Sequence, residues 1–447
     1  MAIPPAKSAL RRTAGARRDD GFVHPPGTRS PPAAAARLRV LFINDTSRNG
    51  GPGRSLFYIL KFLDPEVIYR AALLPRPDVV SDLLRDGGVA EAVFFESKLV
   101  ENPFEPWTRP MQRADFDAPL PVKGVRAIGN VVRGAAAVIS LIRLVKRQRI
   151  DLIFCNGTTA NFAGGAVAAL TGVPALWHVC YTSVAPPIRW LHARLAAHPQ
   201  VRSIVCISTA TTKLFSHCRA KTTIIHNAID TGEFDRAAVA PMLRRELGLD
   251  DQTVVFGSHG RIVPHKGYGE FVRAARLAWD RLSENERQRC RFVVIGDTPQ
   301  DMRRDHLAEC RALVGELGLA DAFHFLGYRP DVKPYVADFD VAVVPSIYDD
   351  PLPRAVLEAM ALSKPVVAFA RGGIDEMIED GSCGALVGGS PPDIAGLAGA
   401  MVRYLREPAL RRRHGKAARR RIEDRFDAAP LARVLQNEML RIYGGRS

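Results

Sequence analysis

The strongest constraint on the fold is a recurring order of a short apolar run, a glycine turn and a helix-like segment. Residues 39–43 (Arg-Val-Leu-Phe-Ile) precede glycines at 50, 51 and 53 and a helical pattern over 55–62, and the same order recurs at 151–170. Parallel strands need crossover helices, and those helices cover both faces of the sheet. The order therefore predicts a doubly wound α/β sheet.

The rhythm continues along the chain and divides into two series. A chain of 447 residues is long for one core, so two Rossmann-like domains facing across a cleft are expected. We predict a basic Pro/Ala-rich disordered tail at 1–36, domains at 37–235 and 236–426, and a helix at 427–447 that returns to the first domain. The further strand-like runs are 175–179, 204–207 and 223–226 in the first series, and 253–256, 292–295, 324–326, 341–344 and 365–369 in the second.

Composition narrows the class of protein. Hydrophobic residues make up 47% and charged residues 24%, which excludes a mainly disordered or coiled-coil chain. The seven cysteines form no CxxC pair, which argues against a zinc site or a disulfide framework and favours a reducing compartment. Neither a signal-peptide core nor an uninterrupted apolar run of about 18 to 20 residues is found. We expect a cytoplasmic protein.

The net charge of +15 suits an anionic partner, and it is concentrated in a few segments. Residues 403–425 contain ten Lys or Arg against three acids, which reads either as a solvated helix face or as a contact for anionic lipid or polysaccharide. Residues 124–150 form an amphipathic helical pattern that packs on its own sheet or lies at a membrane surface. Nucleic-acid binding is disfavoured because few aromatic residues accompany the arginines.

Glycines 50, 51 and 53 stand at the start of a helix, where free backbone N–H groups bind anions or hydroxyls. A dinucleotide-binding loop would have a third glycine at the position of Leu56, so a nicotinamide cofactor is disfavoured. A tight turn without a ligand remains an equal alternative.

Residues 260–267 (Gly-Arg-Ile-Val-Pro-His-Lys-Gly) set Arg261 and Lys266 directly after the first strand of the second series. His265 and Gly267 occupy positions where a phosphate-binding P-loop has Gly and Ser or Thr, so a P-loop nucleotidase is disfavoured. The two cations either bind an anionic group or are ordinary surface charges.

Two carboxylates follow the strand at 341–344. Asp350 lies before the helix that Pro353 begins, and Glu358 lies inside that helix. A carboxylate accepts two hydroxyls at once, which suits a sugar or a ribose; an exposed ion pair is the alternative for Glu358. Gly372-Gly373 form another turn suited to backbone contacts. Asp338-Phe339-Asp340 opens a buried strand and is interpreted as a strand-end feature, not a metal site.

Together these motifs resemble the retaining glycosyltransferases of group 1, also called glycosyltransferase family 4, with the GT-B architecture. The resemblance covers about 39–426 and is most specific at Gly260-Arg261-x4-Lys266-Gly267 and in the acid-x7-Glu pattern from Asp350 to Glu358. Supporting matches are Gly50-Gly51, His178, residues 226–230 with Phe234, Ser346, and Gly372-Gly373.

The resemblance implies a hexosyltransferase with a nucleoside-diphosphate sugar as donor, no metal or other cofactor, and a glycan, lipid-linked or small-molecule acceptor. The second domain would hold the donor and the first the acceptor. Arg261 and Lys266 would contact the diphosphate, Glu358 the ribose and Asp350 the transferred sugar. From the opposite wall, Gly51 would lie against the phosphates or sugar, and His178 near the sugar and acceptor.

The chain departs from the family pattern at Asp350, where the family usually has Glu. The shorter acid shifts its sugar contact by about 1 Å, a displacement that changes rate or donor preference. Three alternatives stay open from sequence: a nucleotide-sugar epimerase of the same fold, a basic nucleic-acid-binding protein and a catalytically inactive scaffold. Polysaccharide biosynthesis at the cytoplasmic membrane face is the expected setting.

Overall fold

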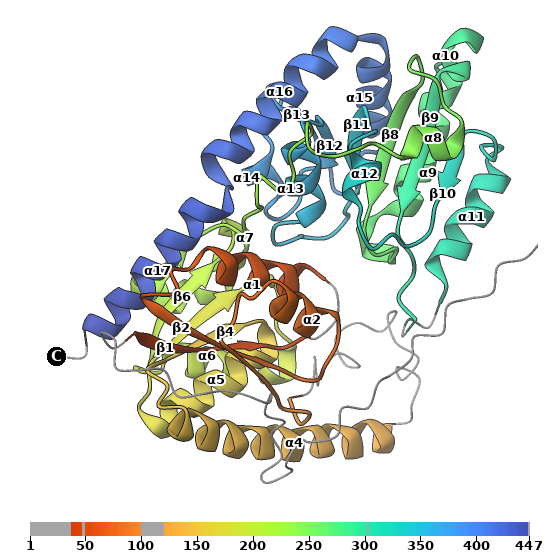
Figure 1. The fold of residues 1–447 in the computed structure, drawn as a ribbon. Helices are drawn as coiled ribbons and strands as arrows, with labels where there is room; N and C mark the ends of the chain where they lie inside the picture. Colours follow the sequence, from red (N-terminus) through yellow and green to blue (C-terminus); the bar gives the residue numbers. More distant parts are fainter. Residues whose placement is uncertain (1–36, 47–49, 100–119, 301, 303, 446–447) are drawn as a thin grey trace, which may run out of the picture.

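The computed structural model describes residues 37–46, 50–99, 120–300, 302 and 304–445 as two α/β lobes joined by a long helical arm (Figure 1). The tail predicted at 1–36 lies outside the described residues. Each lobe contains one parallel sheet with helices on both faces, so the GT-B-like arrangement of two doubly wound sheets is confirmed.

The first lobe is built on a seven-stranded sheet in the order β3-β2-β1-β4-β5-β6-β7. Strand order reverses between β1 and β4, and in such sheets ligands bind at the carboxyl ends of the strands beside this switch point. The strands are β1 (Leu38–Asn44), β2 (Ile68–Leu74), β3 (Ala92–Phe95), β4 (Leu152–Asn156), β5 (Ala175–Val179), β6 (Val201–Cys206) and β7 (Thr222–Ile224).

Helices cover both faces of this sheet, with α4 along the lower edge of the lobe in Figure 1. Buried side chains of α4 and α5 pack on one face, and those of α1 and α2 pack on the other. The helices are α1 (Gly51–Phe62), α2 (Val79–Asp86), α4 (Leu120–Arg147), α5 (Thr158–Thr171), η2 (Pro186–Ile188), α6 (Arg189–Ala197), α7 (Thr209–Thr212) and η3 (Lys213–Lys221).

The second lobe repeats the topology with six strands in the order β10-β9-β8-β11-β12-β13, and its switch point lies between β8 and β11. Its strands are β8 (Val254–His259), β9 (Cys290–Ile295), β10 (Phe323–Phe325), β11 (Val341–Val344), β12 (Val366–Phe369) and β13 (Gly384–Val387). Its helices are α8 (Leu243–Leu247), η4 (Pro264–Lys266), α9 (Tyr268–Asp280), α10 (Glu284–Gln288), α11 (His306–Glu316), α12 (Lys333–Val336), α13 (Arg354–Ala361), α14 (Ile374–Met377), α15 (Ile394–Arg406) and α16 (Pro408–Arg425).

The chain passes between the lobes twice, and the two connecting segments lie side by side. Ile229 of one segment pairs with Asp427 of the other, and the backbone N–H of Ile229 donates to the carbonyl of Phe426 at 2.9 Å. Helix α16 packs on the second lobe against α13. Helix α17 (Ala428–Gly444) then packs on α1, and its Leu435, Met439 and Ile442 lie in the core of the first lobe.

The arginines of α16 do not form the fully solvated face that the sequence suggested. Arg419 donates to the carbonyls of Thr231, Phe234 and Ala361 at 2.6 to 3.0 Å, and Arg421 donates to those of Glu376 and Met377. Arg412, Arg413 and Arg420 are exposed. Arg411 donates to the carbonyls of Tyr404 and Leu405. Three of the six arginines in the two triplets therefore fasten α16 to the molecule, because buried carbonyls need donors and a guanidinium supplies five.

Within α4, residues Ile128–Arg147 are long and apolar enough to cross a membrane, with a mean hydropathy of 1.6 and 28% of the segment buried. Arg133 and Arg143 interrupt this segment, so it contains no long uninterrupted apolar run. One face of α4 packs in the core of the first lobe through Leu141, Leu144 and Val145. That packing places α4 against the sheet as one of its covering helices.

Candidate functional site

A cleft of about 1430 Å³ lies between the lobes and is lined by loops from the carboxyl ends of both sheets. From the second lobe it receives the loops after β8 and β11, and from the first lobe the loops after β1, β4 and β5. It brings together five of the eight predicted site residues, namely Gly51, Arg261, Lys266, Asp350 and Glu358.

The cation at Arg261 is available to a ligand. Gly260, which precedes it, has φ of +138° and its N–H donates to the carbonyl of Ile295, so the chain turns sharply at the end of β8. Arg261 is exposed on the cleft wall and makes no hydrogen bond or ion pair with any residue that the structure describes. A free guanidinium in a concave site is suited to a phosphate, which it binds in a bidentate manner.

Lys266 is paired with the first carboxylate of the motif. Its Nζ lies 2.5 Å from Oδ2 of Asp350, which also accepts from the Ser346 hydroxyl at 3.4 Å. Burial acts to lower the pKa of Lys266, but the Asp350 carboxylate outweighs it and raises that pKa well above its usual value. Lys266 is therefore a permanent cation, and Asp350, only 4% exposed, is held in place beside it.

Glu358 also lines the cleft, and its oxygens already have partners. Oε2 lies 2.8 Å from Nε2 of His259 and Oε1 accepts from Nε of Arg354 at 3.1 Å. Burial raises the pKa of Glu358, but the His259 hydrogen bond and the nearby cations lower it to about 2. Each carboxylate oxygen can accept two hydrogen bonds, so capacity for ribose hydroxyls remains. The ion pairs of Glu358 are buried, unlike the exposed pair predicted as the alternative, and they coexist with its position in the cleft.

Gly372 and Gly373 do not line the cleft, and their contact with a ligand stays a prediction. They lie beneath the Asp350 loop, and the N–H of Gly373 donates to the carbonyl of Asp350 at 2.8 Å. A Cβ at Gly372 would lie 2.2 Å from that carbonyl oxygen, and Gly372 has φ of +66°. Both glycines are required for close backbone packing that positions Asp350.

His178 is likewise outside the cleft lining, and its contact with sugar and acceptor stays a prediction. It is 2% exposed in β5, with Nδ1 2.7 Å from Oδ1 of Asn156. Burial lowers the pKa of His178 to about 4, so the imidazole is neutral. Its position on the strand turns the side chain toward Asn156, and Cys180, two residues later, reaches the cleft wall instead.

The first-lobe wall contains residues that the sequence analysis missed. Asp45 follows β1 directly, is 8% exposed and accepts from the N–H of Thr159 at 3.0 Å. Arg54 lies in the first turn of α1, beside Gly51. Their positions just after a strand and at a helix start were visible signals. In the second lobe, no sequence signal pointed to His259 and Arg354, because their role depends on the packing of β8 against α13.

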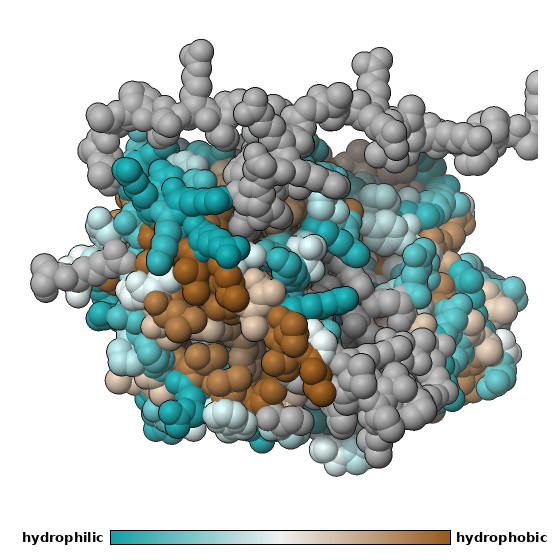
Figure 2. All heavy atoms as spheres, turned by 90° about the horizontal axis from the view of Figure 1, so that it is seen from below, coloured by the Kyte–Doolittle hydropathy of each residue, from teal (hydrophilic) through white to brown (hydrophobic). Residues whose placement is uncertain are grey.

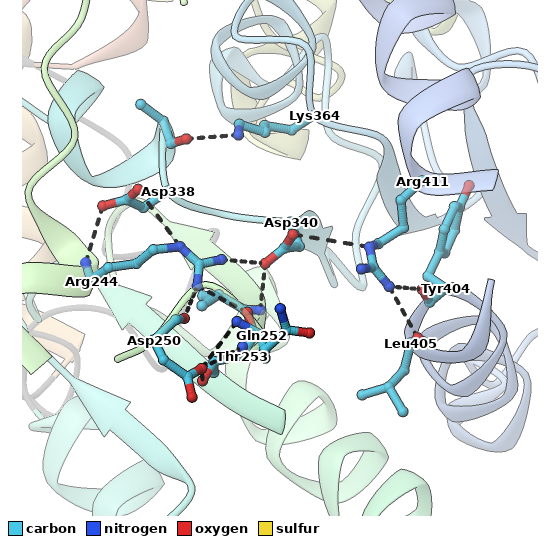
Figure 3. Close-up of polar contacts among 12 residues, drawn as sticks. Arg244, Asp250, Gln252, Thr253, Asp338, Asp340, Lys364, Tyr404, Leu405 and Arg411 are labelled. Carbon is cyan, nitrogen blue, oxygen red and sulfur yellow. Dashed lines mark hydrogen bonds and ion pairs between the residues drawn. The ribbon is translucent and has the colours of Figure 1, made fainter. Parts of the chain in front are cut away.

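The Asp338–Asp340 triplet has a structural role (Figure 3). Arg244 Nη2 donates to Asp340 at 2.7 Å, and its backbone N–H donates to Asp338 at 3.0 Å. The N–H of Val255 also donates to Asp340. These contacts tie α8 to the start of β11 at a distance from the cleft. Among the described residues, no group of three or more His, Cys, Asp or Glu could hold a metal ion.

Comparison with known sequences identifies the relatives of both lobes. Residues 240–421 match a family described as "Glycosyl transferases group 1", and residues 106–233 match "Glycosyltransferase Family 4". The 2-deoxystreptamine glucosyltransferase of Streptomyces kanamyceticus is 30% identical over 353 residues, which is 73% of this chain and 88% of that protein. A D-inositol 3-phosphate glycosyltransferase of Stackebrandtia nassauensis is 40% identical over 149 residues, 33% of each chain.

Solved structures share the fold. The Anabaena HepE protein in complex with UDP-glucose superposes with a TM-score of 0.70 at 20% identity, covering 91% of this chain and all of that one. This likeness extends over both lobes.

Proposed function

Because the chain belongs to the group 1 glycosyltransferases of family 4, we propose that it moves a hexose from a nucleoside-diphosphate sugar to an acceptor hydroxyl with retention of the anomeric configuration. That it is a glycosyltransferase of the GT-B fold follows from the comparisons above. The donor, the stereochemistry and the roles of individual residues are the proposal.

The observation that carries the proposal is the convergence of three groups on one wall of the cleft. Arg261 has no partner in the described part of the chain, Lys266 is a half-buried cation, and Asp350 is fixed between Lys266 and Ser346. The cations face the place where a diphosphate would lie, and Asp350 faces the sugar attached to it. Glu358, farther along the wall, is placed for the ribose.

This arrangement favours the transition state of transfer. The acceptor oxygen bonds to the anomeric carbon while the bond from that carbon to the diphosphate oxygen breaks and leaves its electron pair on the diphosphate. The acceptor proton passes to the departing phosphate on the same face, which retains the configuration. Preorganised cations stabilise the growing negative charge, and the carboxylate stabilises the cationic ring. Two side-chain cations supply the charge that a metal would otherwise supply, so we propose that no metal is needed.

The acceptor would bind mainly to the first lobe, whose loops form the wall opposite the cations. The HepE structures hold UDP or UDP-glucose, which makes UDP the first donor nucleotide to test. We propose a cytoplasmic location. The comparisons do not favour the epimerase, nucleic-acid-binding and inactive-scaffold alternatives.

Thermal unfolding against a panel of nucleoside diphosphates and their sugars tests the proposal. One base should stabilise the protein by about 2.7 kcal/mol at a concentration 100 times its dissociation constant. Turnover with the matching sugar should release the nucleoside diphosphate, and the product's anomeric signal in NMR should match that of the donor. A product of opposite configuration, or an altered free nucleotide sugar without acceptor, would contradict the proposal.

A further inference from the structure

The cleft extends beyond the proposed donor site into a region lined mainly by apolar side chains, with Asn130 and Arg189 beside them. At about 1430 Å³ it exceeds the roughly 300–1,000 Å³ of a usual small-molecule pocket, so a bound donor leaves part of it vacant. We call this region the apolar arm. Its lining comes from α4 (Val131, Gly134, Ala137, Val138), α5 (Phe162, Ala163, Ala166) and η2–α6 (Ile188, Leu191, Leu195).

The apolar arm opens at an exposed apolar strip on α4. Val131, which lines the arm, is 59% exposed, and Ile128 and Val132 beside it are 67% and 63% exposed. Trp190, at the start of α6, is 64% exposed. Figure 2 views the molecule from the side of α4 and shows apolar side chains gathered in one patch with hydrophilic ones at its edge. Exposed apolar side chains gathered in one patch are typical of an interaction site.

The charge around this opening has one sign. Residues 120–150 contain seven Lys or Arg and no Asp or Glu. Arg133, Arg143, Lys146 and Arg147 are exposed on α4, as is Arg189 on α6. A surface that combines apolar side chains with basic ones complements an anionic lipid surface, into which the apolar face enters while the cations meet the headgroups.

We infer that the acceptor is a lipid-linked molecule whose hydrocarbon chain lies in the apolar arm, and that it is taken from an anionic membrane surface against which α4 lies. The inference rests on the proposed function, since the arm and the donor site belong to one cleft. A chain in the arm places the acceptor head group toward the loops after β4 and β5, where Thr158 and Thr182 line the cleft.

Binding of alkyl glucosides tests the apolar arm directly. Methyl, hexyl and decyl β-glucoside, titrated calorimetrically below their micelle concentrations, share one head group and differ only in chain length. Affinity should rise up to about fourfold per methylene, the value for complete transfer of a CH₂ from water. An affinity that does not depend on chain length would overturn the inference.

Two tryptophan variants on α5 localise the binding. Ala166 lines the apolar arm, whereas Leu170, one turn later, is 69% exposed and lies outside the lining. Ala166→Trp should weaken decyl glucoside at least tenfold, and Leu170→Trp should leave it unchanged. UDP stabilisation should persist in both variants, which shows that they fold. If Ala166→Trp binds decyl glucoside as well as the unaltered protein does, the chain does not lie in the arm.

Vesicle flotation distinguishes a membrane source from a soluble apolar glycoside. The protein should float with vesicles of 30 mol% phosphatidylglycerol in phosphatidylcholine and stay in solution with phosphatidylcholine alone. The double change Val131→Asp, Val132→Asp should abolish flotation. The inference would be overturned if the unaltered protein did not float. It would also be overturned if the protein formed a dimer that bound no decyl glucoside and that Val131→Asp dissociated. Glucoside binding without any response to a nucleotide would instead contradict the proposed function alone.

Discussion

At the scale of single residues, ion pairs hold Lys266 and Glu358 in the cleft. Arg261 and Lys266 could be predicted as cations of a binding site because they follow a strand and glycines flank them. The partners could not, since His259 meets Glu358 only when β8 and α13 pack together. His178 shows the opposite limit: its strand-end position is correct, but side-chain direction on the strand turns it to Asn156.

The lowered pKa of Glu358 makes the free energy of unfolding depend on pH in the acidic range. The folded pKa of about 2 lies below the ordinary value of 4.5, so the stabilisation is complete above about pH 4.5 and is lost as pH falls toward 2. The shift corresponds to about 3 kcal/mol. Chemical denaturation at pH 5 and at pH 2 measures how much unfolding free energy each protein loses in acid. This loss should be smaller for Glu358→Gln than for the unaltered protein by about 3 kcal/mol.

The matched control is Glu284→Gln, because Glu284 is 75% exposed. It should follow the unaltered protein across the same pH range. Parallel curves for all three proteins would show that the Glu358 pairs contribute nothing to stability.

At the scale of elements, the loop bearing Asp350 depends on Gly372 beneath it. Gly372→Ala adds a Cβ 2.2 Å from the Asp350 carbonyl oxygen at φ of +66°. Strain of about 1–3 kcal/mol should lower the melting temperature and, by moving Asp350, reduce kcat/KM. Gly318→Ala has a similar φ of +64° with no atom within 4 Å of its Cβ. It should lower stability without reducing kcat/KM, and an equal loss of activity in both would refute the positioning role.

Helix α16 offers a matched pair of neighbouring arginines. Arg419 donates to three carbonyls, on the linker and on α13, whereas Arg420 is exposed. Arg419→Ala should cost about 2 kcal/mol of unfolding free energy, because it leaves part-buried carbonyls without a donor. Arg420→Ala should change it by less than about 0.5 kcal/mol. Equal effects in urea denaturation would show that α16 is held by its apolar contacts alone.

Most strands were predictable as short apolar runs. The runs at 39–43, 175–179, 292–295 and 341–344 all lie in strands. Strands β2, β3 and β13 were missed: β2 carries a buried arginine, Arg70, which is satisfied by Glu91, and β3 and β13 are only four residues long. Local patterns cannot show a buried charge whose partner lies in a distant turn.

At the scale of the whole molecule, two sheets with equivalent strand order place their switch points on opposite sides of one cleft. Because α17 follows the second lobe and packs in the core of the first, the chain connects the two lobes twice. The charge of +15 is explained in part by arginines that bond to carbonyls, and in part by α4. The cleft therefore has a polar end for the donor and an apolar end for the acceptor.

The most direct test of the central claim, that Arg261 and Lys266 hold the departing diphosphate, is calorimetric titration with a nucleoside diphosphate and with its monophosphate. The unaltered protein should bind the diphosphate on the order of 10- to 150-fold more tightly, since one charge-assisted contact is worth about 1.5–3 kcal/mol. In Arg261→Ala and Lys266→Ala that preference should shrink while monophosphate affinity is kept. An undiminished preference in both variants would contradict the account.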